Sequence, residues 1–167
     1  YWRGIETAEA KAESERKKKN RVIAFSALAC LVLATALTVT SIITSTRLKN
    51  QEKAFAEGSQ YIRYSSSDSY SRATEYFSQL PSSYDEKIVD VCMQQARKDF
   101  PGAELDFELD HVLFLLNTAQ SKAAHGSELG REISDMKIRT MIRKGDPAVS
   151  SVIINAYNRE EISYELV

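Results

Sequence analysis

The chain has 167 residues and a formal net charge of −1. Residues 48–167 carry 14 Lys and Arg against 19 Asp and Glu, a net charge of −5, and this part therefore lacks the clustered cations that neutralise nucleic-acid phosphates. These 120 residues are enough for one compact core. We therefore expect one folded domain that does not bind nucleic acid.

The first 21 residues are polar and rich in helix-forming residues, which predicts a solvated helix that leads into the next segment. Basic residues gather near the end of this stretch, at Arg16, Lys17, Lys18, Lys19 and Arg21. Such a cluster sets the topology of a following membrane span and can also contact anionic lipid headgroups. We predict a topogenic role for residues 1–21 as a cytoplasmic basic segment, with headgroup contact as the alternative.

Residues 22–46 contain no charged residue and no His, Asn, Gln, Gly or Pro. About 20 residues of α-helix cross the hydrocarbon layer of a bilayer, whereas a signal peptide has a shorter apolar region and a core helix shows a polar stripe. The sequence predicts a transmembrane helix in a cell (inner) membrane. Six basic residues shortly before this segment, against three shortly after it, place the N-terminus in the cytoplasm and the C-terminal domain outside it, in a bacterium the periplasm.

Small residues recur every four positions along the predicted span, at Ser26, Cys30, Ala34 and Thr38. This spacing allows two helix backbones to approach closely in lipid. We therefore predict a packing face for a partner helix, either from a second copy of the chain or from another membrane protein. The span has no ionisable residue, so it is not expected to conduct ions by itself.

Residues 47–66 are interpreted as a juxtamembrane linker that begins as helix and ends in a serine-rich loop, and 67–167 as a globular domain outside the cytoplasm. The first helix of this domain is expected from Ser67 or Asp68 to Phe77. Ser83 and Glu86 have the spacing of a capping box, which predicts the start of a second helix.

The second helix presents one apolar face and ends at the sequence Phe-Pro-Gly of residues 100–102. Its expected face consists of Tyr84, Ile88, Val91, Cys92 and Ala96, at helical spacing. Cys92 is therefore expected to be a buried, unreactive thiol. Residues 104–124 alternate at first but then continue an apolar stripe into an alanine-rich stretch, which favours a helix over a strand.

The last forty residues determine the fold class. Polar and apolar residues alternate over 136–143, β-branched residues are frequent over 149–157, and 162–167 alternate again, which favours a three-stranded meander. The alternative is a helical hairpin, in which Gly145 ends one helix, Asp146 caps the next and Pro147 occupies its first turn. We predict an α+β domain, with helices packed on an antiparallel sheet, and all-α helical hairpins as the alternative.

Catalytic and metal-binding patterns are missing from the sequence. The only histidines, His111 and His125, are interpreted as a helix-face residue and a loop residue, and no His or Cys pair has zinc-ligand spacing. The acidic residues over 104–110 lack the glycine turn and the terminal glutamate of a calcium loop. We therefore expect no enzyme activity, no metal and no cofactor.

Two functions remain after these exclusions. The layout of a short cytoplasmic segment, one anchor and a modest exported domain resembles the inner-membrane scaffold proteins of type IV secretion systems. This resemblance implies a structural subunit of a multiprotein cell-envelope assembly, such as a secretion or conjugation machine, with other membrane proteins and the bilayer as its partners. The alternative is an extracytoplasmic sensor, or ligand-binding module, whose pocket or interface would use tyrosines such as Tyr61, Tyr64, Tyr70 and Tyr76.

Overall fold

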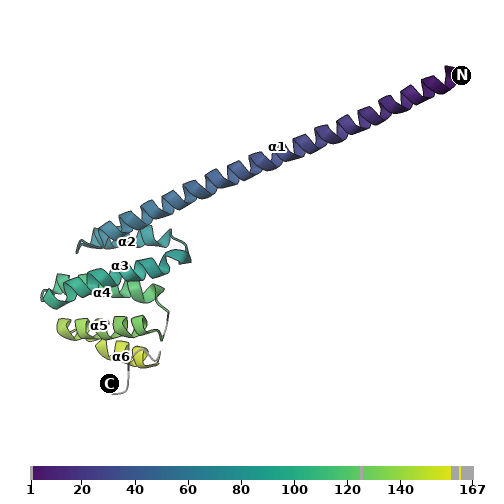
Figure 1. Ribbon diagram of the computed structural model, residues 1–167. Helices are drawn as coiled ribbons and strands as arrows, with labels where there is room; N and C mark the ends of the chain where they lie inside the picture. Colours follow the sequence, from purple (N-terminus) through teal and green to yellow (C-terminus); the bar gives the residue numbers. More distant parts are fainter. Residues whose placement is uncertain (1, 125, 159–161, 163–167) are drawn as a thin grey trace. The chain divides into compact units, whose positions relative to one another are not determined.

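The computed structural model describes residues 2–124, 126–158 and 162, and all regular structure within them is helical (Figure 1). In chain order the elements are α1 (Trp2–Tyr61), α2 (Ser67–Ser78), η1 (Ser82–Tyr84), α3 (Asp85–Asp99), η2 (Phe100–Gly102), α4 (Asp106–Lys122), α5 (Glu128–Lys144) and α6 (Val149–Asn158). The structure divides into two compact units after Lys49, within α1. Each unit is described separately below.

The N-terminal unit is the helical segment that precedes residue 50, and its apolar side chains face outward. Phe25 and Leu37 are 72% and 70% exposed, and no residue of the most apolar window of α1 is buried within the structure. Hydroxyl groups of this segment bond to the helix backbone; for example, Thr38 Oγ1 donates to the carbonyl oxygens of Ala34 and Thr35 at 3.1 and 2.8 Å. α1 is thus long and apolar enough to span a membrane.

The last turns of α1 belong to the C-terminal unit, where they help to form its core. The ring of Phe55 lies 5.8 Å from that of Tyr84 and 6.3 Å from that of Phe77, measured between centroids. One turn later, Gly58 faces the Phe77 ring so closely that a Cβ atom there would lie 2.6 Å from Phe77 Cε1. A glycine at this position therefore lets α1 and α2 approach each other.

The next two helices agree in extent with the sequence analysis but begin differently. Ser66 caps α2, since its hydroxyl oxygen accepts the N–H of Ser69 at 3.2 Å. The predicted capping box of Ser83 and Glu86 is wrong, because residues 82–84 form η1 and the first residue of α3 has no side-chain cap. The predicted face of α3 is confirmed, with Ile88, Cys92 and Ala96 fully buried.

α4 is the central helix of the C-terminal unit, because it packs against α3 and also against α5. The preference for a helix over 104–124 is confirmed. Its buried residues cover more than one face: Leu109, His111, Val112, Leu115, Leu116 and Ala119. A helix that is apolar on most sides is expected in the interior of a domain.

The predicted α+β fold is wrong, and the all-α alternative fits. The expected strand over 136–143 lies inside α5, and the one over 149–157 is α6. Of the expected strand over 162–167, only Ile162 is among the described residues, and it packs with Ile138 and Ala156. No sheet is present in the described part of the chain for the helices to cover.

The chemistry at the end of α5 explains why this segment forms a helical hairpin. Gly145 adopts the left-handed conformation (φ 71°), and the N–H of Asp146 donates to the Met141 carbonyl at 2.9 Å, which is a Schellman-type end. The carboxylate of Asp146 then accepts the N–H of Ala148 at 2.8 Å, just before α6 begins. The buried positions of α5 follow helical rather than alternating spacing: Gly130, Ile133, Ser134, Ile138, Thr140 and Met141.

We expect Gly58→Ala to lower the free energy of unfolding of the C-terminal unit by about 1–3 kcal/mol, the usual cost of overpacking a core. The added methyl group would collide with the Phe77 ring, which is 3% exposed and cannot swing into solvent. Urea unfolding of the detergent-solubilised protein, followed by circular dichroism, measures the change.

Gly102→Ala is the matched control, because a Cβ atom at residue 102 would meet no atom within 4 Å. This variant should unfold close to the wild-type midpoint. Equal midpoints for the two variants would contradict the close contact of α1 with α2.

Candidate functional site

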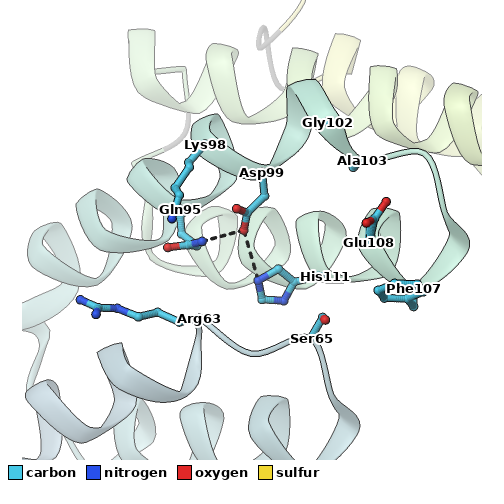
Figure 2. A pocket seen from close by; sticks show the side chains of 10 residues that line it. All are labelled: Arg63, Ser65, Gln95, Lys98, Asp99, Gly102, Ala103, Phe107, Glu108 and His111. Atoms are coloured by element: carbon cyan, nitrogen blue, oxygen red, sulfur yellow. Dashed lines mark hydrogen bonds and ion pairs between the residues drawn. The ribbon is translucent and has the colours of Figure 1, made fainter.

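The C-terminal unit contains a cavity of about 440 Å³ beside His111, which we call the His111 pocket (Figure 2). Three segments form it: the connection after α1, the end of α3 with η2, and the first turns of α4. Its lining consists of Arg63, Ser65, Gln95, Lys98, Asp99, Gly102, Ala103, Phe107, Glu108 and His111. The size lies within the range of about 300–1,000 Å³ that is usual for small-molecule sites.

The wall formed by η2 is held in place from α5. The Arg143 guanidinium donates to the carbonyl oxygens of Phe100 and Ala103 at 2.7 and 3.2 Å, and it lies 4.3 Å from the centroid of the Phe100 ring. These contacts satisfy backbone acceptors in the turn between α3 and α4. The turn therefore has a defined position, although it is short and contains Pro101 and Gly102.

His111 is the most buried polar side chain of the pocket, with 4% of the residue exposed. Its Nε2 atom lies 3.4 Å from Asp99 Oδ2, and its ring is stacked on Tyr70 with centroids 5.6 Å apart. Neither ring nitrogen makes a well-aligned hydrogen bond within the described residues. Burial lowers the pKa of His111 below its ordinary value, against the opposing effects of the Asp99 carboxylate and the Ile62 backbone. The neutral imidazole is therefore favoured near pH 7.

Each of the two carboxylates of the pocket has one oxygen atom engaged by neighbouring groups. Asp99 Oδ2 accepts the side-chain amide of Gln95 at 2.7 Å in addition to its contact with His111 (Figure 2). Glu108 Oε2 accepts the backbone N–H groups of Glu104 and Leu105, each at 3.0 Å, and these bonds lower the pKa of the Glu108 carboxyl. Glu108 thus caps the start of α4, in the way that had been expected for Glu86.

The acidic residues over 104–110 do not form a metal centre. Besides the capping role of Glu108, Asp110 forms an ion pair with Lys144 of α5. Among the described residues, no cluster of three or more His, Cys, Asp or Glu side chains could hold a metal ion.

The site residues predicted from the sequence lie in the N-terminal unit, and none of them lines the His111 pocket. The small residues of the predicted packing face, Ser26, Cys30, Ala34 and Thr38, are all exposed along α1. The basic residues Arg16, Lys17, Lys18, Lys19 and Arg21 are also exposed, and Lys17 forms an ion pair with Glu13 at 2.7 Å.

Other residues singled out in the sequence have structural positions or lie outside the described part. Tyr61 stacks on Tyr76 at 5.8 Å, and Tyr70 packs behind His111 on Phe114 at 4.3 Å, so these tyrosines do not line the pocket. Burial raises the pKa of the Cys92 thiol to about 12, as expected for an unreactive cysteine. His125 lies outside the described residues.

Sequence analysis missed the His111 pocket because its residues come from three separate segments. The sequence placed His111 on a helix face but did not distinguish an exposed face from a buried one. The run of five apolar residues from Val112 to Leu116 carried the missing signal, because such a run indicates a helix that is covered on several sides. A histidine directly before that run is then expected to be buried as well.

No protein-family model matches the chain, and neither the curated proteins nor the solved structures include a match to it.

We expect the free energy of unfolding to fall as the pH is lowered from about 7.5 to 5. The pKa of His111 is lowered in the folded state, so the unfolded chain takes up a proton first, starting near the ordinary pKa of about 6.5. This single proton contributes a slope of at most about 1.4 kcal/mol per pH unit. In His111→Phe, which keeps a ring against Tyr70, the slope should become shallower in urea titrations over this range.

His125→Asn serves as the control, because it removes the other histidine of the sequence. This variant should keep the wild-type slope. If His125→Asn flattens the pH dependence and His111→Phe does not, the assignment of the linked proton to His111 is wrong.

Proposed function

We propose that the protein is a single-pass membrane protein whose helical C-terminal unit is a binding module within a multiprotein membrane assembly, and not an enzyme. The observation that carries the proposal is the 25-residue uncharged stretch over 22–46, whose large apolar side chains are more than half exposed. In water such an apolar surface would have to be covered by other protein, whereas in a bilayer the lipid chains cover it.

The orientation of the span is proposed from its flanking charges. The basic cluster of Arg16, Lys17, Lys18, Lys19 and Arg21 precedes the span, and fewer basic residues follow it. The rule that positive charges remain in the cytoplasm then places the C-terminal unit on the opposite side of the membrane. In a bacterium this side is the periplasm.

The role as a subunit of an assembly is supported by the arrangement of the helices. From α3 to α6 each helix packs on the next one in the chain, as in helical adaptors built from hairpins. Ile142 and Ile154, on α5 and α6, are 60% and 59% exposed and offer apolar area to a partner protein. The resemblance to type IV secretion scaffolds implied helices packed on a sheet, and the all-helical C-terminal unit does not fit it.

A second candidate function, a ligand-binding module that signals through the membrane, is favoured by the location of the His111 pocket. Arg63 and Ser65 line this pocket directly after the end of α1 at Tyr61. The ring of His111 lies near the backbone of Ile62 in the same connection. A ligand in the pocket would therefore contact the residues that immediately follow the proposed membrane helix.

Membrane anchoring is tested by placing two arginines in the middle of the span. Leu33→Arg combined with Leu37→Arg should release the protein from membranes washed with alkaline carbonate, because each arginine costs about 2.5–3.5 kcal/mol at the centre of a bilayer. The wild-type protein should stay in the membrane pellet, and protease added on the non-cytoplasmic side should digest its C-terminal unit.

Asn50→Arg combined with Gln60→Arg adds the same charge at exposed positions of α1 outside the span and should leave the protein in the pellet. Release of the wild-type protein by carbonate would contradict the anchor. Digestion of the C-terminal unit only from the cytoplasmic side would reverse the proposed orientation.

Assembly through the small-residue face is tested with Ala34→Leu. In mild detergent the wild-type protein should migrate in a complex well above its own mass of 18.8 kDa, and the larger side chain should weaken this complex by separating the helix backbones. Ala36→Leu makes the same change on the opposite side of α1 and should have little effect. If the wild-type protein is monomeric, or if the two variants weaken the complex equally, the small-residue face does not mediate assembly.

A further inference from the structure

Positive and negative charges are separated along α1 just before the uncharged stretch. Every acidic residue of the first 21 positions lies at or before Glu15, whereas residues 16–21 include five cations and no acid. Of these five, Lys17 forms an ion pair with Glu13 at 2.7 Å. The other four form no ion pair or hydrogen bond with the described residues: Arg16, Lys18, Lys19 and Arg21. Four uncompensated positive charges therefore lie immediately before the proposed span.

The five cations surround the helix, because they occupy almost consecutive helical positions. Each residue of an α-helix is rotated by about 100° from the one before it. The four residues 16–19 therefore point in four directions, and Arg21 lies between Lys17 and Lys18 around the axis. All five are exposed. We call residues 16–19 and 21 the cationic collar.

The cationic collar lies next to the segment proposed to cross the hydrocarbon layer. Arg21 directly precedes Val22, the first residue of the uncharged stretch, and Arg16 is about 9 Å from Val22 along the helix axis. This distance is about one Debye length at physiological ionic strength, so attraction to charged headgroups is only partly screened. After the span, by contrast, only Arg47 and Lys49 lie within the first turn, and they do not enclose the helix.

A helix that is positively charged on all sides fits a partner that encloses it. A protein docked against one side of α1 would leave the rest of the cationic collar in water. The headgroups of a lipid leaflet enclose a membrane helix completely, and anionic headgroups attract nearby Lys and Arg residues. Zwitterionic headgroups carry no net charge to balance the cations. The geometry therefore favours anionic lipid over a docked protein.

We infer that the cationic collar binds anionic phospholipids and retains them around α1 at the proposed cytoplasmic surface. The Lys and Arg side chains donate charge-assisted hydrogen bonds to the phosphate oxygens. This inference rests on the proposed membrane anchor and names the lipid class that is its partner at this end. A purely topogenic role requires the charges only during insertion, whereas the cationic collar gives the folded protein a lasting preference for anionic lipid.

A tryptophan beside the cationic collar reports which lipid chains surround this end of the span. Phe25→Trp, combined with Trp2→Phe to remove the single native tryptophan, is reconstituted into vesicles of phosphatidylcholine and phosphatidylglycerol. One of the two lipids carries brominated chains, which quench tryptophan fluorescence, and both leaflets have the same composition, so the orientation of the protein does not matter. Phosphatidylglycerol should bind at least about threefold more tightly than phosphatidylcholine. About 0.5 M NaCl should remove most of this preference.

Variants of the reporter protein identify the residues responsible. Lys18→Gln combined with Lys19→Gln should bring the ratio of the two lipid affinities close to one. Lys87→Gln combined with Arg131→Gln removes the same charge at exposed positions of the C-terminal unit and should keep the original ratio. Arg16→Gln and Lys18→Gln, which lie on opposite sides of the helix, should each lower the ratio by a similar factor.

Equal affinities for the two lipids in the unsubstituted collar, or the same ratio in both double variants, would overturn the inference and leave the membrane anchor intact. A loss of preference from only one of the two single variants would indicate a partner on one side of α1 and would also overturn it. If neither brominated lipid quenches the tryptophan, residue 25 does not lie in the bilayer. In that case the proposed membrane anchor is wrong as well.

Discussion

The C-terminal unit depends on the burial of α4 between α3 and α5. Val112, Leu115 and Leu116 are fully buried on this helix, and burial of each such side chain contributes about 1.5–3 kcal/mol relative to exposure. Both neighbouring helices pack on α4, so loss of α4 would remove the core that the two helices share through it. His111 lies one turn before Leu115 on the same helix and is buried with it. Desolvation of the His111 ring lowers its pKa.

The helices up to residue 124 could be predicted from the sequence because their apolar residues keep helical spacing over several turns. The end of α3 at residues 99–102 and the burial of Cys92 also followed from local chemistry. The C-terminal helices could not be separated from strands by pattern alone. Ile138 and Ile142 fit an alternating pattern in the sequence, but in the structure Ile138 is buried and Ile142 is 60% exposed. The left-handed Gly145, with Asp146 after it, settles the choice in favour of a hairpin of helices.

The candidate membrane span can be recognised from the sequence alone, whereas the His111 pocket cannot. The uncharged stretch over 22–46 is a local property, so a candidate span is visible without any structure. The His111 pocket is a tertiary property, because Arg63, Asp99 and His111 come together only when three segments fold against each other. Sequence analysis gave the residue types but not their proximity, and the tyrosines that it offered for a pocket or an interface are not among the residues that line this pocket.

Amide hydrogen exchange of the protein in lipid nanodiscs tests the central position of α4 most directly. If α4 is the packing surface for both neighbours, the amides over 109–119 should be the slowest to exchange in the C-terminal unit, because they open only when the whole unit unfolds. α6, whose only buried residue is Ala156, should exchange much faster. Exchange over 109–119 that is as fast as exchange in α6 would contradict this account.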